Sequence, residues 1–265
     1  MRREMAVDFA GTLQRVRSMG FERIELCSFR GCAGNPWGDF GELADWQPDE
    51  IRSALGAAQI GSTAAHVTHD ELTANKFDPT INWVRDVGCR VIVLAALPVP
   101  PEPTLPAWQD AFASLNLIGA EIAARGMEFA YHTQNDVWQT IDDTLLADEL
   151  FRQVDANVCR IELDPSGAIV SGADWQAVVS RNRGRFFAMH LRDGRQPPEK
   201  VPYLPALPLG EGEIDWQSAI QNSSAAGISD YYLEMEVDQE HDVFGALDDS
   251  LAHLVARGIL TGASR

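Results

Sequence analysis

The chain has 265 residues and a formal net charge of -18, from 21 basic and 39 acidic side chains. This length allows one domain or two, and single α/β barrels are often about 250 residues long. The excess of acidic residues argues against a protein that binds the phosphate backbone of a nucleic acid, because a phosphate-binding surface needs many basic side chains. Hydrophobic residues make up 45% of the chain, a proportion that is ordinary for a globular protein.

The cysteines and the N-terminus indicate in which cellular compartment the protein is expected. Cys27, Cys32, Cys89 and Cys159 are scattered, and the spacing of the first two fits neither a CxxC redox pair nor a zinc knuckle. We interpret them as free thiols in a reducing compartment. The first five residues lack the apolar centre of a signal peptide, and no apolar run approaches the about 20 residues of a membrane span. We therefore expect a cytoplasmic protein without a membrane partner.

Strand-like and helix-like segments alternate along the whole chain. The first strand-like run that we identify begins at residue 23, and the last ends at residue 236. Period-two and continuous apolar patterns predict strands over residues 23–27, 61–67, 90–96, 128–132, 159–164, 186–191 and 231–236. Period-3.6 patterns predict helices over residues 9–19, 48–58, 79–87, 107–125, 142–154, 175–181, 216–226 and 244–257.

This alternation predicts an α/β protein with a parallel sheet, and its repeated units point to a (β/α)₈ barrel. No break in composition divides the chain, so we expect one domain over residues 1–265. Seven strands are predicted rather than eight, because no apolar run precedes Phe9. Either the first strand is absent from this chain, or another element closes the barrel. A missing strand would expose a sheet edge and favour self-association into a homo-oligomer.

Three polar residues fall at or near the ends of successive predicted strands: Asp164, His190 and Glu234. In a parallel barrel such ends gather on one face, and carboxylates with an imidazole are ligands for a divalent metal. Glu236 lies two residues after Glu234 and should face the same way, as a base or a supporting group. Glu162 faces the same way as Asp164 but one layer deeper, as a buried structural acid.

Four more side chains are candidates for contact with a substrate. His66 and His132 end predicted strands, and Glu25 lies within the strand at 23–27. Arg192 follows His190 and could hold a phosphate. Each has an alternative explanation, because histidines at strand ends often hydrogen-bond within the core and loop arginines are usually solvated.

Several segments, taken together and in this order, resemble the sugar phosphate isomerase/epimerase family with the xylose isomerase-like barrel. They are residues 8–13, 19–26, 65–67, 162–165 with 172–174, 184–193 and 209–216. Members of that family include ketose epimerases, inosose dehydratases and, more distantly, endonuclease IV. The resemblance covers nearly the whole chain and implies a metal held by Glu, Asp, His and Glu. By motif, Asp164, His190 and Glu234 match three of these ligands.

The fourth ligand departs from the family pattern. The family often reads Tyr-His-Asn-His-x-x-Glu-Phe, whereas residues 131–138 place Val137 where the glutamate ligand should stand and Gln134 where the second histidine should stand. Asp136 is adjacent, but successive side chains alternate in direction, so it is no simple replacement. Arg192 also stands in place of the usual lysine.

The resemblance implies a metal-dependent isomerase or epimerase acting on a keto-sugar or cyclic polyol, with Mn²⁺, Mg²⁺ or Zn²⁺ as cofactor. Glu234, His190 and Glu236 are then the catalytic candidates, with Glu25, His66, His132 and Arg192 around the substrate. A first alternative is a dehydratase acting on a keto-inositol or a 3-keto-glycoside in the same barrel with one base. A second alternative, motivated by Val137, is a degenerate or partner-dependent subunit.

Overall fold

The computed structural model describes residues 1–27, 43, 46–133, 135–196, 204–235 and 242–260. The chain groups into two compact units. The first comprises Met1–Pro98 and Leu115–Tyr131, and the second comprises Val99–Ser114 and His132–Ser264. Helix α5 (Leu105–Ala123) therefore belongs to the second unit at its start and to the first at its end.

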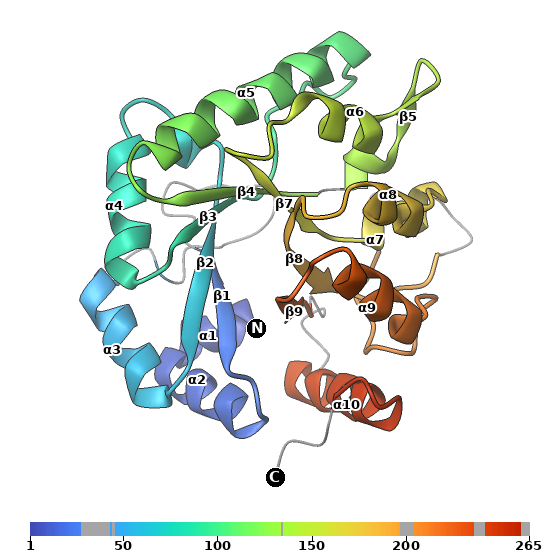
Figure 1. Cartoon of the computed structure of the whole chain (residues 1–265). Coiled ribbons are helices and arrows are strands. Elements are labelled where there is room, and N and C mark those ends of the chain that lie inside the picture. Colours follow the sequence, from blue (N-terminus) through green and yellow to red (C-terminus); the bar gives the residue numbers. More distant parts are fainter. Residues whose placement is uncertain (28–42, 44–45, 134, 197–203, 236–241, 261–265) are drawn as a thin grey trace. The chain divides into compact units, whose positions relative to one another are not determined.

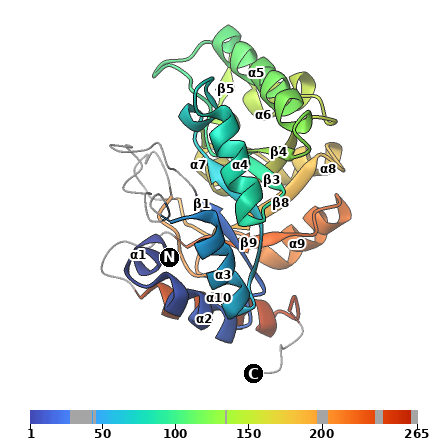
Figure 2. The ribbon, with the colours of Figure 1, turned by 90° about the vertical axis from the view of Figure 1, so that its left-hand side faces the viewer.

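The first unit contains four parallel strands in chain order (Figure 1). They are β1 (Arg23–Cys27), β2 (Gly61–Val67), β3 (Val91–Leu94) and β4 (Glu128–His132), whose last residue begins the second unit. Helices α1 (Arg2–Val7), α2 (Phe9–Ser18), α3 (Pro48–Ala58) and α4 (Phe77–Val87) and the short 3₁₀ helix η2 (Asp70–Leu72) complete it. Figure 2 shows α3 and α4, which contact each other, lying over these strands.

Local chemistry explains these elements. Strand β3 reads Val-Ile-Val-Leu and is buried along its whole length, as expected of a parallel strand that is covered on both faces. Helix α3 begins with Pro48 in its first turn, and the Glu50 carboxylate accepts a 2.8 Å hydrogen bond from the Gln47 amide. Helix α4 ends at Gly88, whose φ of 104° is a left-handed conformation that glycine adopts without strain.

The second unit contains three parallel strands, in the order β7 (Arg160–Leu163), β8 (Phe186–Leu191) and β9 (Tyr231–Leu233). All six residues of β8 are buried. A small antiparallel hairpin joins β5 (Thr140–Ile141) to β6 (Thr144–Leu145). The helices are α6 (Leu146–Gln153), α7 (Ser166–Ser171), α8 (Trp175–Arg181), α9 (Trp216–Ala225) and α10 (Val243–Ala256), with the 3₁₀ helix η3 (Asn135–Trp138). Helices α8 and α9 contact each other beside the strands (Figure 1).

Aspartates start three helices of the second unit. Asp174, Asp215 and Asp242 each accept a hydrogen bond from a backbone amide in the first turn of α8, α9 and α10. These bonds satisfy amide groups that have no partner inside a helix, and the negative charge suits the positive end of the helix dipole. Three of the acidic residues of the chain thus define where helices begin.

The α/β class and all seven predicted parallel strands are confirmed in the described residues, although several strands are shorter than predicted. The predicted helix over residues 142–154 is wrong in its first turn. Asp142 and Asp143 have φ values of 48° and 59° and form the tight turn between β5 and β6. Two successive residues with positive φ suit a two-residue hairpin, and aspartate tolerates that conformation. Helix α7, which follows Pro165, was not predicted.

The prediction that the cysteines are free thiols is confirmed for three of the four residues. Cys27, Cys89 and Cys159 are free thiols, and the last two are buried. Cys32 lies outside the described residues. Burial raises the pKa of the Cys89 thiol to about 11, although a hydrogen bond between Cys89 and Ser62 acts in the opposite direction. Among the described helices, none combines the length and the apolar character that crossing a bilayer requires.

Glu149 in α6 gives the second unit a pH-dependent contribution to stability. Its buried carboxylate accepts bonds from Arg152, Gln153 and Gln109. The Arg152 hydrogen bond is the main cause that lowers the pKa of Glu149 from 4.5 to about 2. Because the pKa is lower in the folded state, this contribution is complete above pH 4.5 and is lost as the pH falls towards 2.

We expect Glu149→Gln to lower the free energy of unfolding by about 1–2 kcal/mol near pH 7, allowing for the solvent exposure of Arg152. The difference from the native chain should shrink towards about pH 3. Urea unfolding at both pH values measures it, with the exposed Glu102→Gln as control. An equal loss at both pH values would contradict this account.

Candidate metal site

Six polar side chains gather at the ends of the strands of the second unit. They come from the last residue of β4, from β7 and β8, and from the residues just after β7, β8 and β9: His132, Glu162, Asp164, His190, Arg192 and Glu234. Five of them are buried, with at most 9% of their surface exposed. Only Glu234 is partly accessible, with 26% of its side chain exposed. The cluster is therefore largely shielded from solvent, and one of its carboxylates is accessible.

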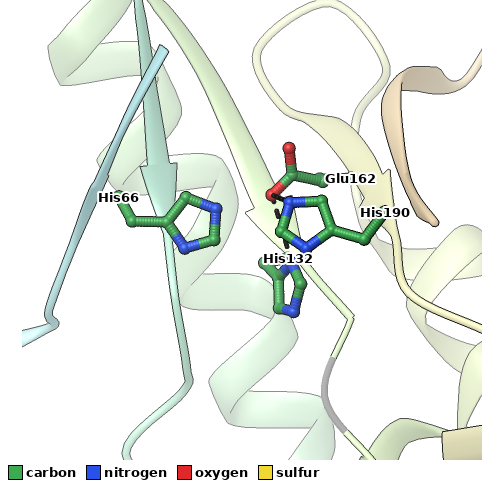
Figure 3. Close-up of side chains that lie close together, drawn as sticks. All are labelled: His66, His132, Glu162 and His190. Atoms are coloured by element: carbon green, nitrogen blue, oxygen red, sulfur yellow. Dashed lines mark hydrogen bonds and ion pairs between the residues drawn. The ribbon is translucent and has the colours of Figure 1, made fainter. Parts of the chain in front are cut away.

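Glu162 occupies the most buried position of the cluster and has no exposed surface. Its Oε2 atom lies 3.1 Å from Nδ1 of His132 and 3.3 Å from Nε2 of His190. Figure 3 shows both imidazole rings turned towards this one carboxylate. The two rings are also close to each other, with centroids 4.7 Å apart. Glu162 thus fixes the orientation of both histidines.

Asp164 is held by the loop that follows β7. Its Oδ1 atom accepts a 2.8 Å hydrogen bond from the Ser166 amide, and its own amide donates to the Thr133 hydroxyl at 2.8 Å. The other oxygen, Oδ2, faces Nε2 of His132 at 3.9 Å and Nη1 of Arg192 at 4.0 Å. The backbone therefore uses one oxygen of Asp164 and presents the other to the cluster.

Glu234 lies between a histidine and an arginine. Its Oε2 atom is 2.9 Å from Nδ1 of His190, and its Oε1 atom is 3.6 Å from Nη1 of Arg192. Burial acts to raise the pKa of Glu234, but the Arg192 charge and the His190 hydrogen bond outweigh it and hold the pKa well below the usual range of a carboxyl. Glu234 is therefore ionised at neutral pH.

The charges of this cluster favour a bound cation. Glu162, Asp164 and Glu234 are three carboxylates, and Arg192 is one guanidinium, so two negative charges remain when both histidines are neutral. Ligand atoms of Asp164, His190 and Glu234 all lie within 4.8 Å of one another. Carboxylate oxygens and imidazole nitrogens suit Zn²⁺ or Mn²⁺, and carboxylates also suit Mg²⁺. The residues present thus fit the divalent metal that the sequence predicts.

The other predicted site residues are placed as follows. Glu25 and His66 pair with each other in the first unit, with 3.1 Å between Oε2 and Nε2. Glu236 and Gln134 lie outside the described residues. Val137 is fully buried in η3. Burial raises the pKa of Asp136, but among the described residues Asp136 does not join the group of ligand atoms around Asp164.

Asp193 is a residue of the site region whose role the sequence does not reveal. It is fully buried directly after Arg192. Its carboxylate accepts five hydrogen bonds, from the amides of Gly194, Gly210, Gly212 and Ile214 and from the indole of Trp216. A Cβ atom at Gly212 would lie 1.9 Å from Asp193 Oδ1, so only glycine fits there. The signal in the sequence is the glycine-rich segment 209–216, which this carboxylate folds around itself.

A family model, the xylose isomerase-like TIM barrel, matches residues 13–256 of the chain. The chain belongs to the xylose isomerase-like TIM-barrel family. This membership confirms the predicted fold class, and it agrees with the seven parallel strands of the described residues.

Proteins that are similar to this chain carry different names. An inosose dehydratase of Geobacillus thermodenitrificans is 25% identical in an alignment of 195 residues, and the alignment covers 64% of this chain and 64% of the relative. A sugar phosphate isomerase/epimerase of Parabacteroides distasonis superposes with a TM-score of 0.75 at 16% identity, covering 96% of this chain and 94% of the other. The IOLI protein, solved with a bound zinc atom, superposes with a TM-score of 0.69 at 16% identity, covering 95% of each chain.

We expect Asp193→Asn to destabilise the fold by about 2–4 kcal/mol, because an amide group offers one acceptor oxygen and turns its NH₂ towards amide donors. Urea unfolding measures the loss, with the exposed Asp110→Asn as control. A loss below about 0.5 kcal/mol would show that segment 209–216 does not depend on this carboxylate.

We also expect the purified chain to bind about one divalent ion, and Asp164→Asn and His190→Ala each to weaken its binding at least about tenfold. Elemental mass spectrometry after dialysis against a chelator series measures the occupancy. Asp110→Asn, far from any predicted ligand in the sequence, is the control. Full occupancy in both variants would exclude this metal site.

Proposed function

We propose that the chain is a metal-dependent enzyme that transfers a proton at the carbon next to the carbonyl group of a keto-sugar or of a ketone formed from a cyclic polyol. The observation that carries this proposal is the group formed by Asp164, His190 and Glu234, whose ligand atoms lie within 4.8 Å of one another. Membership of a family that includes sugar isomerases, epimerases and dehydratases supports it.

A divalent cation held by these three residues would polarise the carbonyl of a bound substrate and acidify the neighbouring C–H bond. The residues themselves supply the rest of the chemistry. Arg192 places its guanidinium 3.6 Å from Glu234, so a second positive charge lies where negative charge develops on a substrate oxygen. The buried surroundings strengthen these electrostatic effects, because little water screens them.

Glu234 is the best candidate for the base within the described residues. It is the only carboxylate of the cluster with an accessible side chain, at 26% exposure. Its lowered pKa keeps it ionised and ready to accept a proton, although a base of low pKa is intrinsically weak. Contact with the substrate is therefore assigned to Glu234, which also holds the metal together with Asp164 and His190.

Among the described residues Glu234 is the one base assigned to the substrate, and a reaction with one base is restricted. Inverting a stereocentre takes a group on each face of the substrate, and the buried Val137 offers neither a ligand nor a base on the second face. One base can remove a proton and return it to the adjacent carbon, which is the isomerisation of a ketose to an aldose. We therefore favour isomerisation over two-base epimerisation.

Dehydration is the second candidate, and the same observation favours it. One base removes the proton next to the carbonyl and passes it to the hydroxyl group on the following carbon, which leaves as water while a carbon–carbon double bond forms. The similarity to an inosose dehydratase also supports this candidate.

We expect the metal-loaded chain to exchange the proton next to the carbonyl of at least one keto-sugar or ketocyclitol in D₂O. Proton NMR of a substrate panel measures it. Glu234→Gln should slow the exchange by about 100-fold or more, because the amide cannot accept the proton. The exposed Glu211→Gln is the matched control and should behave as the native chain.

The products separate the two candidates. Deuterium in an aldose product supports isomerisation, whereas a new unsaturated product with its conjugated absorbance supports dehydration. Neither exchange nor product with any panel member would contradict the proposal and leave a partner-dependent subunit as the explanation.

A further inference from the structure

The second unit contains a cavity that the proposed metal site does not use. Its volume is about 450 Å³, which is typical of small-molecule sites in proteins. Its lining comes from α7 and the turn after it, from the first turn of α8, and from residues 196 and 213–215. Of the described residues that line it, none belongs to the polar cluster. The cavity is therefore a place for a second ligand or for a second part of the substrate.

The cavity is built on the same loops that carry the polar cluster. Ala168 lines one part of it and stands four residues after Asp164, so their backbones are at most about 14 Å apart even along an extended chain. Gln196 lines another part and follows Asp193 by three residues. Asp193 also accepts a 3.3 Å hydrogen bond from the amide of Ile214, a third lining residue. These short connections hold the cavity close to the cluster.

The charge of the lining excludes an anionic ligand. Glu213 and Asp215 contribute two carboxylates, whereas no lysine or arginine is among the described residues that line the cavity. A phosphate or a carboxylate would be repelled there and would meet no cationic partner. The cavity therefore suits either a cation or a neutral ligand.

The two carboxylates are poorly placed to hold a metal cation. Both oxygens of Asp215 accept hydrogen bonds from Ser218, at 3.4 Å from its amide and at 2.7 Å from its hydroxyl. Oε1 of Glu213 accepts a 3.2 Å bond from the Gln196 amide. One remaining carboxylate oxygen is too little for a metal ion, which takes four or more ligands. A neutral ligand is thus favoured.

Three polar atoms of the lining have no hydrogen-bond partner among the described residues. Oε2 of Glu213 and Oε1 of Gln196 are acceptors, since Gln196 uses its Nε2 atom to donate to the Val170 carbonyl at 3.4 Å. Nε2 of Gln176 is a donor, since its Oε1 atom accepts a 2.6 Å bond from Asn222. A ligand with both hydroxyl donors and hydroxyl acceptors would satisfy all three atoms.

Apolar side chains complete the lining. Ile169, Trp175 and Ile214 offer carbon surface beside the three polar atoms. A sugar ring matches this combination, because its hydroxyl groups donate and accept hydrogen bonds while its C–H face packs on aliphatic and aromatic side chains.

We propose that this cavity binds a neutral sugar ring that is joined by a glycosidic bond to the ring that reacts at the metal site. This subsite rests on the proposed function and adds a substrate class to it. The substrate is then a keto-sugar that carries a second, neutral glycosyl group, rather than a free or phosphorylated monosaccharide. The first ring lies at the cluster, and the second ring contributes affinity and orientation.

Calorimetry of the full chain with neutral disaccharides of glucose, galactose and mannose tests this inference. The matching monosaccharides and their phosphates are the comparison. At least one disaccharide should bind about tenfold more tightly than either. Gln176→Ala should reduce this preference about fivefold, as expected for the loss of one hydrogen bond.

Two further variants make the test specific to the cavity. Ala173→Trp adds bulk to the lining without removing a side-chain hydrogen bond and should abolish the preference for disaccharides. Gln139→Ala changes an exposed glutamine outside the cavity and should retain the native preference. If Ala173→Trp does not fold, the comparison of Gln176→Ala with Gln139→Ala decides.

The outcomes separate this inference from the proposed function. Equal binding of monosaccharides and disaccharides, tighter binding of the phosphates, or a preference that persists in Gln176→Ala and Ala173→Trp would overturn the subsite. Proton exchange of a keto-monosaccharide would then leave the proposed function standing. Disaccharide binding that depends on Gln176, in a chain that exchanges no substrate proton, would support the sugar site and contradict only the proposed function.

Discussion

A carboxylate without contact with water must be neutralised by its neighbours, because burying an uncompensated charge costs more than most folds can supply. Glu162 meets that condition at the centre of the second unit, where no part of it is exposed and two imidazoles approach one of its oxygens. Asp164 and Glu234 add two further negative charges nearby, while Arg192 supplies one positive charge. Two negative charges of the cluster therefore remain to be balanced, by protonated imidazoles or by a metal ion.

Strand β8 organises much of this chemistry within four consecutive residues. His190 lies inside the strand and faces two carboxylates, and Arg192 follows the strand and faces Asp164 and Glu234. Asp193 comes next and gathers the segment 209–216 through its five hydrogen bonds. The Arg192 guanidinium also donates to the Leu204 carbonyl, which limits its movement. Rigid support of this kind keeps charged groups in place before a substrate arrives.

The sequence predicts the position of the site better than its internal connections. Asp164, His190 and Glu234 end apolar runs, and the ends of parallel strands lie on one face, so their proximity follows from periodicity alone. The bridge from Glu162 to His132 and His190 depends instead on strand register and on side-chain torsions, which local patterns do not encode. For the same reason the sequence gives Glu162 only a general role as a buried acid, and it gives Asp193 none. The turn at Asp142 and Asp143 was missed because a charged pair before an apolar stretch also resembles the first turn of a helix.

The most direct test of a metal held by Asp164, His190 and Glu234 is anomalous diffraction from crystals of the native chain grown with Zn²⁺ or Mn²⁺. The account predicts one strong anomalous peak at the ends of β7, β8 and β9, within about 2.0–2.3 Å of these three side chains. A map without a peak there, or with metal bound only at other surface positions, would contradict it.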